Sequence, residues 1–266
     1  MIRLNNISYS YSGAPALVSV SADIKSGITA VIGEAGSGKS TLCEIISGIT
    51  APDKGSVTIN GRPAAECTGY VGMVFQYPEH QLFAETVYDD IAFGPKNLGI
   101  AELDERVKAA AQTVGIDLDL LSADPFCISG GEKRLAAIAG ILAMEPRVIV
   151  LDEPSAGLDP LGRKRIFNIL KELKNADADR IIVFVTHSMD DAAEYADNII
   201  LLENGRIAAQ GTPREVFYSD SSAGLPEIVK LAALLAEKGI DTKRPVTIDE
   251  AYTALSALLS GGARDA

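Results

Sequence analysis

One stretch near the N-terminus limits the possible folds more than any other part of the sequence. Residues 31–41 read VIGEAGSGKST, and the spacing from Gly33 to Ser40 fits the phosphate-loop pattern GxxxxGK[ST]. In such a loop a glycine-rich turn joins a strand to a helix whose N-terminus faces bound phosphates. The stretch therefore predicts an α/β fold that binds a nucleoside triphosphate.

Each residue type in this loop has a mechanical role. The three glycines at 33, 36 and 38 permit backbone angles that side chains forbid, so successive N–H groups can turn toward phosphates. Lys39 would neutralise the terminal phosphates, and the Ser40 hydroxyl would coordinate Mg²⁺. A nucleoside triphosphate and Mg²⁺ are therefore the expected ligands; the resemblance given below implies that the nucleotide is ATP. The expected nucleotide-binding residues of the loop are Gly33, Glu34, Ala35, Gly36, Ser37, Gly38, Lys39, Ser40 and Thr41.

Two further motifs supply groups for hydrolysis. VIVLDEP at 148–154 places Asp152 and Glu153 at the carboxyl end of an apolar strand, where open α/β sheets bind ligands. Asp152 would reach Mg²⁺ through water, and Glu153 would orient or deprotonate the attacking water. His187 ends the run IIVFVTH, a position that favours contact with the γ-phosphate. The alternative is structural: such acid pairs also cap helices or turns, and a lone histidine such as His80 is usually structural.

The composition is that of a soluble protein with a substantial core. Of the 266 residues, 47% are hydrophobic and 23% are charged. The net charge of −12 opposes binding to polyanions, so nucleic acid is not an expected ligand. The three cysteines, Cys43, Cys67 and Cys127, lack the spacing of a zinc site or a disulfide framework. The apolar stretch at 135–144 is about half the length of a bilayer crossing, so neither a membrane span nor a signal peptide is expected.

Apolar patterns predict the elements of the N-terminal part. Strand-like runs at 2–4 and 18–24 flank the polar stretch SYSYSGAP at 8–15, which we interpret as a loop. After the phosphate loop the apolar spacing predicts a helix that Gly48 and Pro52 end. Its apolar face consists of Leu42, Ile45, Ile46 and Ile49.

The remaining patterns predict a parallel core with helices around it. Continuous apolar runs at 148–151 and 181–185 are typical of strands covered on both faces. Asn60-Gly61 and Asn204-Gly205 predict hairpin turns. A helix starting near 129 and another that ends at Gly115 precede the first of these strands. The latter helix has Leu103, Val107, Ala110 and Val114 on one face.

Two amphipathic helices are expected beyond residue 218, separated by the polar linker at 238–245. They could pack on their own domain or form part of a dimer contact. Their apolar stripes are Ile228, Leu231 and Leu235 in the first and Ile248, Tyr252, Leu255 and Leu259 in the second.

The stretch ISGGEKR at 128–134 allows two interpretations. Ser129 followed by Glu132 fits a capping box, so it could simply start a helix. The intervening Gly130 and Gly131 leave the backbone bare, which also makes this helix start a good anion site. Because the phosphate loop already surrounds its own nucleotide, a second anion site suggests that it serves the nucleotide of another molecule.

In this order the motifs resemble the nucleotide-binding subunit of an ATP-binding cassette (ABC) transporter. The resemblance covers about residues 1–217 and includes the phosphate loop, Gln76 in VFQYPEHQLF, ISGGE, VIVLDEP, SAGLDP at 155–160 and VTH ending at His187. It implies a P-loop NTPase cassette with a mainly parallel sheet core, an N-terminal antiparallel β part and a helical subdomain inserted at about 77–145. A short helical C-terminal extension at 218–266 would follow, possibly as a dimer contact.

The same resemblance implies how the site residues act. Two cassettes would sandwich two ATP molecules, with Ser129, Gly130, Gly131 and Glu132 of one subunit facing the γ-phosphate held by Lys39 of the other. Tyr11 would stack on adenine, unless Tyr9 takes that place, and Asp159 would couple the two sites. The implied catalytic residues are Glu153, His187 and Gln76, and the implied metal-binding residues are Ser40, Gln76 and Asp152.

A narrower resemblance is to the ATPase subunits of energy-coupling factor (ECF) transporters, which import vitamins and transition-metal ions. It rests on residues 77–99, SAGLDPLGR at 155–163 and QGTPREVF ending at 217. In that group the segment after Gln76 receives a helix of the membrane-embedded T component. The apolar residues of this segment could form that surface or be buried core; they are Leu82, Phe83, Val87 and Ile91.

The expected function is therefore that of an ATP-hydrolysing motor subunit of an importer, peripheral on the cytoplasmic face of the cell membrane. Its expected partners are a second ABC ATPase subunit, in a homo- or heterodimer, the T component and a substrate-binding membrane protein. The alternatives are a subunit of a conventional ABC importer or exporter, or a soluble ABC ATPase acting on chromosomes or ribosomes. The chain has neither the long coiled coil nor the tandem cassettes of the soluble types.

Three positions depart from the usual ABC pattern. Glu34 places an acid in the phosphate loop, where it would repel ATP unless it points outward. Glu132 replaces the commoner glutamine. Leu135 stands where arginine is usual, and Arg134 one place earlier would carry its charge on another face of the helix.

Overall fold

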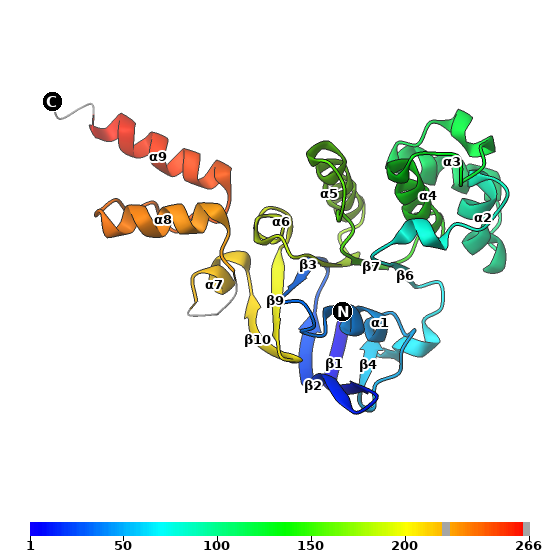
Figure 1. Ribbon diagram of the computed structural model, residues 1–266, viewed down its shortest axis with the longest axis horizontal. Coiled ribbons are helices and arrows are strands. Elements are labelled where there is room, and N and C mark those ends of the chain that lie inside the picture. Colours follow the sequence, from blue (N-terminus) through cyan, green and yellow to red (C-terminus); the bar gives the residue numbers. More distant parts are fainter. Residues whose placement is uncertain (220–223, 263–266) are drawn as a thin grey trace.

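The protein is built on two β-sheets that share a core, with helices on the outer face of the larger one (Figure 1). The structure, a computed structural model, describes residues 1–219 and 224–262, with side chains as far as Leu258. The smaller sheet is antiparallel and has the order β2-β1-β4-β5. Its strands are β1 (Ile2–Tyr11), β2 (Ala14–Ile24), β4 (Lys54–Ile59) and β5 (Arg62–Pro63).

The larger sheet has the order β10-β9-β3-β8-β7-β6. Its pairings are parallel except for the hairpin of β9 and β10, which confirms the expected parallel core. The strands are β3 (Gly27–Ile32), β6 (Val71–Val74), β7 (Val148–Asp152), β8 (Ile181–Val185), β9 (Asn198–Glu203) and β10 (Arg206–Gly211).

The apolar runs of the central strands are buried on both faces because successive side chains point to opposite sides of the sheet. On one face Val150 and Val183 pack with the helix α1 (Lys39–Ile46) and with the small sheet. On the other face Leu151 and Phe184 pack with α5 (Pro160–Ala176) and α6 (Met189–Tyr195). Because β3, β7 and β8 are parallel, their carboxyl ends lie at the same edge of the larger sheet.

A group of helices lies between β6 and β7 and forms a distinct lobe in Figure 1. It contains the 3-10 turn η2 (Pro78–Gln81), α2 (Val87–Asn97), α3 (Leu103–Val114), the 3-10 turn η3 (Leu118–Ser122) and α4 (Gly130–Leu142). The helix α4 packs against α2, α3, η2 and β6, so it joins this lobe to the edge of the large sheet.

Two N-terminal expectations are wrong. The polar stretch at 8–15 is not a loop: β1 continues to Tyr11, and only Ser12 and Gly13 turn the chain into β2. This part of β1 is largely exposed, so its polar residues suit the solvent side of an antiparallel sheet. Ile49 is not part of the helical face, because α1 ends at Ile46 and Ile49 is exposed.

The apolar residues after Gln76 divide between core and surface. Leu82, Val87 and Ile91 are buried in the main core, whereas Phe83 is exposed. Phe83 packs edge-on against Phe93 of α2, with ring centroids 4.8 Å apart. The core interpretation therefore holds for three of the four residues.

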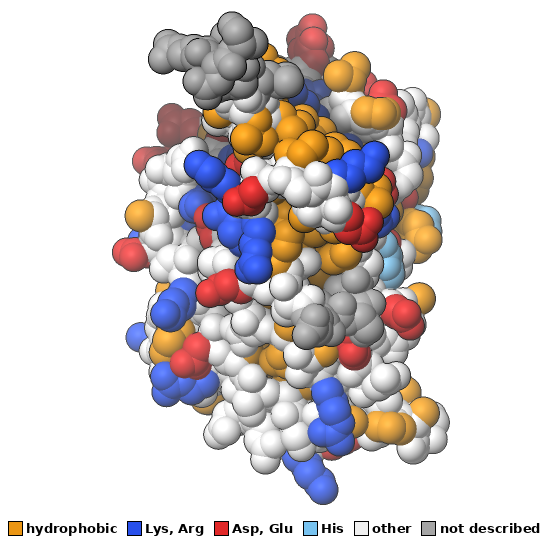
Figure 2. All heavy atoms as spheres, turned by 90° about the vertical axis from the view of Figure 1, so that its left-hand side faces the viewer, with side chains coloured by type: hydrophobic (Ala, Val, Ile, Leu, Met, Phe, Trp, Pro, Cys, Tyr) orange, Lys and Arg blue, Asp and Glu red, His pale blue; other side chains and the backbone are white. Residues whose placement is uncertain are grey.

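Three helices follow β10: α7 (Pro213–Phe217), α8 (Glu227–Glu237) and α9 (Ile248–Gly262). The apolar residues of α7 are buried, whereas α8 and α9 turn much of their apolar surface outward. The buried residues of α8 are Val229 and Ala232, which differ from the stripe that the sequence suggested, and α9 buries Ala251. Figure 2 shows hydrophobic side chains gathered on this face. The exposed ones are Leu231, Leu234, Ile248, Tyr252 and Leu258, while the side chain of Leu259 lies outside the described residues.

Within the described parts of the chain, no helix combines the length and the apolar character needed to cross a bilayer.

Candidate active site

The phosphate loop connects the buried strand β3 to α1, as the motif predicts. Gly33 and Gly38 have positive φ angles of 147° and 101°. A Cβ on Gly33 would overlap the carbonyl oxygen of Leu202, and one on Gly38 would overlap that of Ala16. Both positions therefore require glycine, because the loop passes directly against the neighbouring backbone.

Lys39 is folded back over its own loop. Its Nζ donates hydrogen bonds to the carbonyl oxygens of Gly33, at 2.9 Å, and Glu34, at 2.7 Å. Burial lowers the pKa of Lys39, and the nearby Glu153 and Asp152 partly offset this effect. The ammonium group is thus held at the centre of the loop, where it can reach phosphate oxygens by exchanging carbonyl partners.

Asp152, at the end of β7, supplies an unused acceptor beside the loop. Its carboxyl group is buried and its Oδ1 has no hydrogen-bond partner among the described residues. Burial raises the pKa of Asp152, while a hydrogen bond with Ser40 lowers it. A hydroxyl, a buried carboxylate and the amide oxygen of Gln76 are ligands that suit Mg²⁺, which keeps several waters and substrate oxygens in its shell. The residues present therefore fit a magnesium ion carried with a nucleotide.

This fit does not depend on an all-protein metal cage. The described residues include no group of three or more His, Cys, Asp and Glu side chains that could hold a metal ion. A magnesium site at Ser40, Asp152 and Gln76 would include phosphate oxygens of the nucleotide, as is usual for Mg²⁺ in nucleotide-hydrolysing proteins.

Glu153 is held between the two other expected catalytic residues. Its Oε1 lies 2.7 Å from Nε2 of His187, and its Oε2 accepts from Nε2 of Gln76 at 3.3 Å. Glu153 also has a positive φ of 48°, an uncommon conformation for a residue with a side chain. The structure therefore brings Gln76, Glu153 and His187 together, from three segments that are distant in sequence.

The signature residues start α4 as a capping box. The Oγ of Ser129 accepts from the backbone N–H of Glu132 at 3.3 Å, and the Glu132 carboxylate accepts from the backbone N–H of Ser129 at 2.8 Å. The Ser129 hydroxyl also donates to this carboxylate at 2.6 Å. Hydrogen bonds from Ser129 lower the pKa of Glu132. A Cβ on Gly130 or Gly131 would meet nothing within 4 Å among the described residues, so this helix start is open to a ligand.

The remaining expected site residues, Asp159 and Tyr11, make local contacts. Asp159 caps α5 by accepting from the backbone N–H of Gly162 at 2.7 Å. Tyr11 is half exposed, and its hydroxyl accepts from Thr41 at 3.3 Å beside the start of α1. Tyr9 is less exposed and packs edge-on against Tyr11, so Tyr11 has the freer ring face. Their proposed roles remain predictions.

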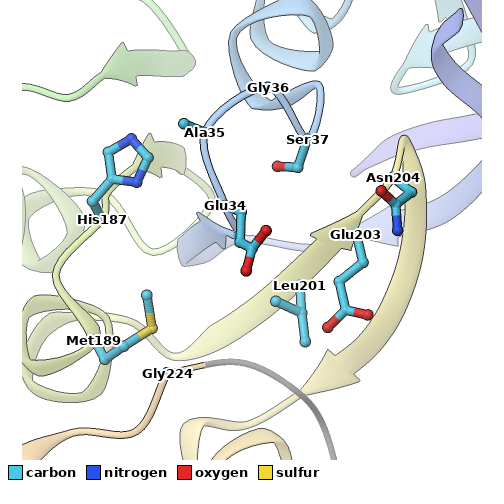
Figure 3. Close-up of a pocket in the computed structure, with 11 residues that line it drawn as sticks. Glu34, Ala35, Gly36, Ser37, His187, Met189, Leu201, Glu203, Asn204 and Gly224 are labelled. Atoms are coloured by element: carbon cyan, nitrogen blue, oxygen red, sulfur yellow. The ribbon is translucent and has the colours of Figure 1, made fainter.

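Glu34 points away from the centre of the phosphate loop. Figure 3 shows its side chain extending toward Leu201 and Glu203, on the far side of the loop from the start of α1. The space there is a hollow of about 460 Å³ that His187 and Met189 also line. The acid in the loop is therefore oriented outward.

Two sets of polar contacts near the expected site residues were not predicted from the sequence. Arg163 donates to the buried Asp191 at 2.7 Å and also to Ser188, which connects the starts of α5 and α6 next to His187. The spacing of Ser188 and Asp191 is a helix-cap signal that could have identified part of this network. Burial raises the pKa of Asp191, and Arg163 opposes this shift.

Arg134 is the second such case. It lies on a different helix face from the partly buried Leu135, as expected, but that face turns inward, toward Gln76 and the loop after Glu153. These contacts join segments that are far apart in the sequence, so no local pattern indicates them.

Comparison with known proteins gives a consistent family. The family model for "ABC transporter" matches residues 17–156. The ECF transporter ATP-binding protein EcfA2 of Streptococcus sanguinis is 44% identical, with 94% of this chain and 97% of the relative covered. EcfA2 of Caldanaerobacter subterraneus subsp. tengcongensis is 42% identical, with 98% of each chain covered.

Solved structures agree with these relatives. The structure of cbiO1 from Clostridium perfringens, described as part of the ABC transporter complex cbiONQ, has a TM-score of 0.75 and 34% identity, covering 89% of this chain and 96% of that one. A dimeric ATP-binding cassette in a post-hydrolysis state with ADP and Pi has a TM-score of 0.73 and 26% identity, covering 80% and 99%. With Glu153, His187 and Gln76 assembled beside an intact phosphate loop, the chain belongs to the ABC transporter family, as an ATPase subunit of the energy-coupling factor type.

Proposed function

We propose that this ATPase works as one of two cassettes that close on ATP and thereby drive uptake of a vitamin or a transition-metal ion through separate membrane proteins. The observation that carries the proposal is the pairing of Glu153 with His187 and Gln76 at the edge of the phosphate loop. A nucleophilic water placed beside Glu153 would lie next to the γ-phosphate held by that loop.

The chain's own residues divide the work of hydrolysis. Lys39 exchanges its carbonyl partners for phosphate oxygens, and Ser40 and Asp152 hold the magnesium ion that neutralises phosphate charge when bound. Glu153 accepts a proton from the attacking water, or orients it, while Gln76 fixes its position. His187 keeps the carboxylate aimed at the loop and reaches toward the γ-phosphate.

The second cassette would complete each nucleotide site. The start of α4 presents bare backbone at Gly130 and Gly131, and helix N-termini attract anions. In the proposed sandwich this helix start of one subunit contacts the γ-phosphate bound by the other, and Asp159 lies at the boundary between the two sites. A partner ATPase could be a second copy or a related chain.

The membrane partner would dock on the segment after Gln76. Tyr77, Phe83 and Phe93 are exposed there, and the last two are already packed against each other. Exposed aromatic rings of this kind are common anchors at protein interfaces. We propose that a helix of the membrane-embedded T component rests on them, that a substrate-binding membrane protein completes the complex, and that the ATPase is therefore peripheral on the cytoplasmic face of the cell membrane.

The C-terminal extension would form a second contact between the two ATPases. Its exposed apolar face on α8 and α9 includes Leu234, Ile248 and Tyr252. Burial of such a face against an equivalent one would remove apolar surface from water.

The central test is a variant that binds ATP without hydrolysing it. Glu153→Gln in the full chain is expected to retain ATP in the presence of Mg²⁺ and to dimerise at least tenfold more tightly on a sizing column than ATP-free protein or the surface variant Glu172→Gln. If Glu153→Gln traps no ATP and does not dimerise, either alone or mixed with a second ATPase subunit, the sandwich proposal is wrong. Dimerisation only in the mixture would assign a heterodimer.

The membrane partners are tested by copurification from membranes. A tagged chain is expected to bring down both a T component and a small substrate-binding membrane protein. Phe83→Asp should abolish this capture without changing ATP binding, and recovery of a conventional transporter pore instead would contradict the ECF assignment of the partners.

A further inference from the structure

Arg134 is a buried cation that the proposed chemistry does not use. Arg134 and Lys39 are the only basic side chains that are buried in the described parts of the chain. Lys39 serves the phosphates. Arg134 lies in the second turn of α4, just after the signature residues, and burying its charge is unfavourable unless it is well paired.

The guanidinium group of Arg134 contacts three residues in two segments of the chain. Its Nη1 donates to the carbonyl oxygen of Ala156, in the loop that follows Glu153. Its Nη2 lies 3.4 Å from the carbonyl oxygen of Gln76 and 3.4 Å from the carboxylate of Glu79. Glu79 is partly exposed, so its ion pair with Arg134 is weak. The two backbone carbonyls are the other hydrogen-bond partners of Arg134.

Both carbonyls belong to turns that carry the catalytic pair. The backbone N–H of Ala156 donates to the carbonyl of Glu153 at 3.1 Å, so Ala156 closes the turn that holds Glu153 at its positive φ. The Gln76 carbonyl belongs to the residue whose side chain donates to Glu153. Any change in the Gln76–Glu153 pair that shifts these turns is therefore imposed on Arg134 and on α4.

We propose that Arg134 is a positioning residue that transmits the state of the Gln76–Glu153 pair to the start of α4. ATP bound by a cassette then sets the orientation of that cassette's own Ser129–Glu132 seat before the partner arrives. The use of this seat by a partner rests on the proposed sandwich, but the transmission occurs within one chain and can be measured without a dimer.

The absence of tryptophan from the chain allows a single fluorescent reporter. Phe126 is exposed near the signature, and its carbonyl accepts from Lys133 of α4 at 3.1 Å, so Phe126→Trp reports the position of this helix start. The experiment adds a non-hydrolysable ATP analogue with Mg²⁺ to full-length Phe126→Trp protein, diluted until it is monomeric. The expected result is a saturable change in fluorescence.

In Phe126→Trp with Arg134→Met, the change is expected to fall at least fivefold, while the analogue's dissociation constant stays within about twofold. Arg134→Lys should recover part of the fluorescence change, because lysine keeps the positive charge but has fewer hydrogen-bond donors than arginine. Arg106→Met is the matched control, because it breaks a surface ion pair with Glu145 in the same helical lobe. The fluorescence change of this control should equal that of Phe126→Trp alone.

The proposal would be overturned if the analogue caused the same fluorescence change with Arg134→Met as without it. It would also be overturned if the analogue caused no fluorescence change in Phe126→Trp itself. If Arg134→Met does not fold, Arg134→Lys decides: with fewer donors for the two carbonyls it should at least halve the fluorescence change, and an undiminished change would overturn the proposal. Because the protein is monomeric throughout, a failure of the sandwich would appear only in the Glu153→Gln dimerisation test.

Discussion

At the scale of single residues, Glu132 occupies the helix start that the phosphate of a partner's ATP would use. Its carboxylate accepts from the backbone N–H and hydroxyl of Ser129, which are donors that a phosphate would otherwise engage. A bound γ-phosphate must therefore displace a negative charge or lie close to it. The capping and anion-site interpretations of this stretch are thus not exclusive, since the cap supplies the competing anion.

Replacing Glu132 with glutamine, the commoner residue at this position, should tighten ATP-dependent dimerisation. Two charges about 4 Å apart repel by roughly 1 kcal/mol in water, which corresponds to about fivefold in affinity. The measurement is the dimer dissociation constant of Glu153→Gln with ATP, with and without Glu132→Gln. Glu105→Gln, an exposed change on α3, is the control, and unchanged or weaker dimerisation in Glu132→Gln would contradict the prediction.

Glu132 also predicts a dependence of stability on pH. Hydrogen bonds from Ser129 lower its folded-state pKa, whereas the unfolded chain titrates near the ordinary glutamate value of about 4.3. A lowered carboxyl pKa stabilises the fold above the unfolded value, and this stabilisation is lost as pH falls through the folded value. The melting temperature of the native chain should therefore exceed that of Glu132→Gln by a constant amount near neutral pH. The difference in melting temperature should shrink below about pH 4.3. A difference that persists in acid would argue against a capping box that depends on the ionised Glu132.

At the scale of elements, the helix caps are local devices whose energies can be isolated. Thr212 and Glu215 form a capping box at the start of α7, with the Thr212 backbone N–H donating to Glu215 at 2.8 Å. Thr212→Ala should cost about 1 kcal/mol and lower the melting temperature by roughly 2–4 °C. Calorimetry checks this, with the exposed Ser56→Ala as control. ATP affinity should not change, because α7 lies beyond the last strand; a loss of affinity would show that α7 supports the site.

The same distinction between local and distant interactions explains what the sequence could predict. The phosphate loop, the strands around 148–152 and 181–185, and the Ser129 cap follow from neighbouring residues, and all are present. Arg134 contacts a carbonyl 58 residues away, at Gln76, which no periodicity encodes. The prediction of a loop at 8–15 was wrong for a related reason, since the pairing of β1 with β2 and β4 overrides local propensity.

At the scale of the whole molecule, the contact between two ATPases has to survive the open state. ATP-dependent closure can recur rapidly only if the cassettes remain near each other after ADP leaves, since a tethered encounter is governed by effective concentration. The surfaces that enclose ATP cannot supply this lasting contact, because they must separate to release ADP. A contact outside them is therefore required, and the exposed face of α8 and α9 is the candidate that the fold offers.

Ile248 and Tyr252 test that role, because they are 74% and 73% exposed and lie one turn apart on α9. Changing both to aspartate should weaken nucleotide-free association at least tenfold, either with a second copy or with the second ATPase, as measured by analytical ultracentrifugation. The melting temperature of the monomer should change little, since neither side chain is buried in it. Leu118→Asp, an apolar-to-acid change on the helical lobe, should leave association intact. If the double variant associates as strongly as the native chain, the apolar face has another occupant, and the open cassettes must be held together by their membrane partner instead.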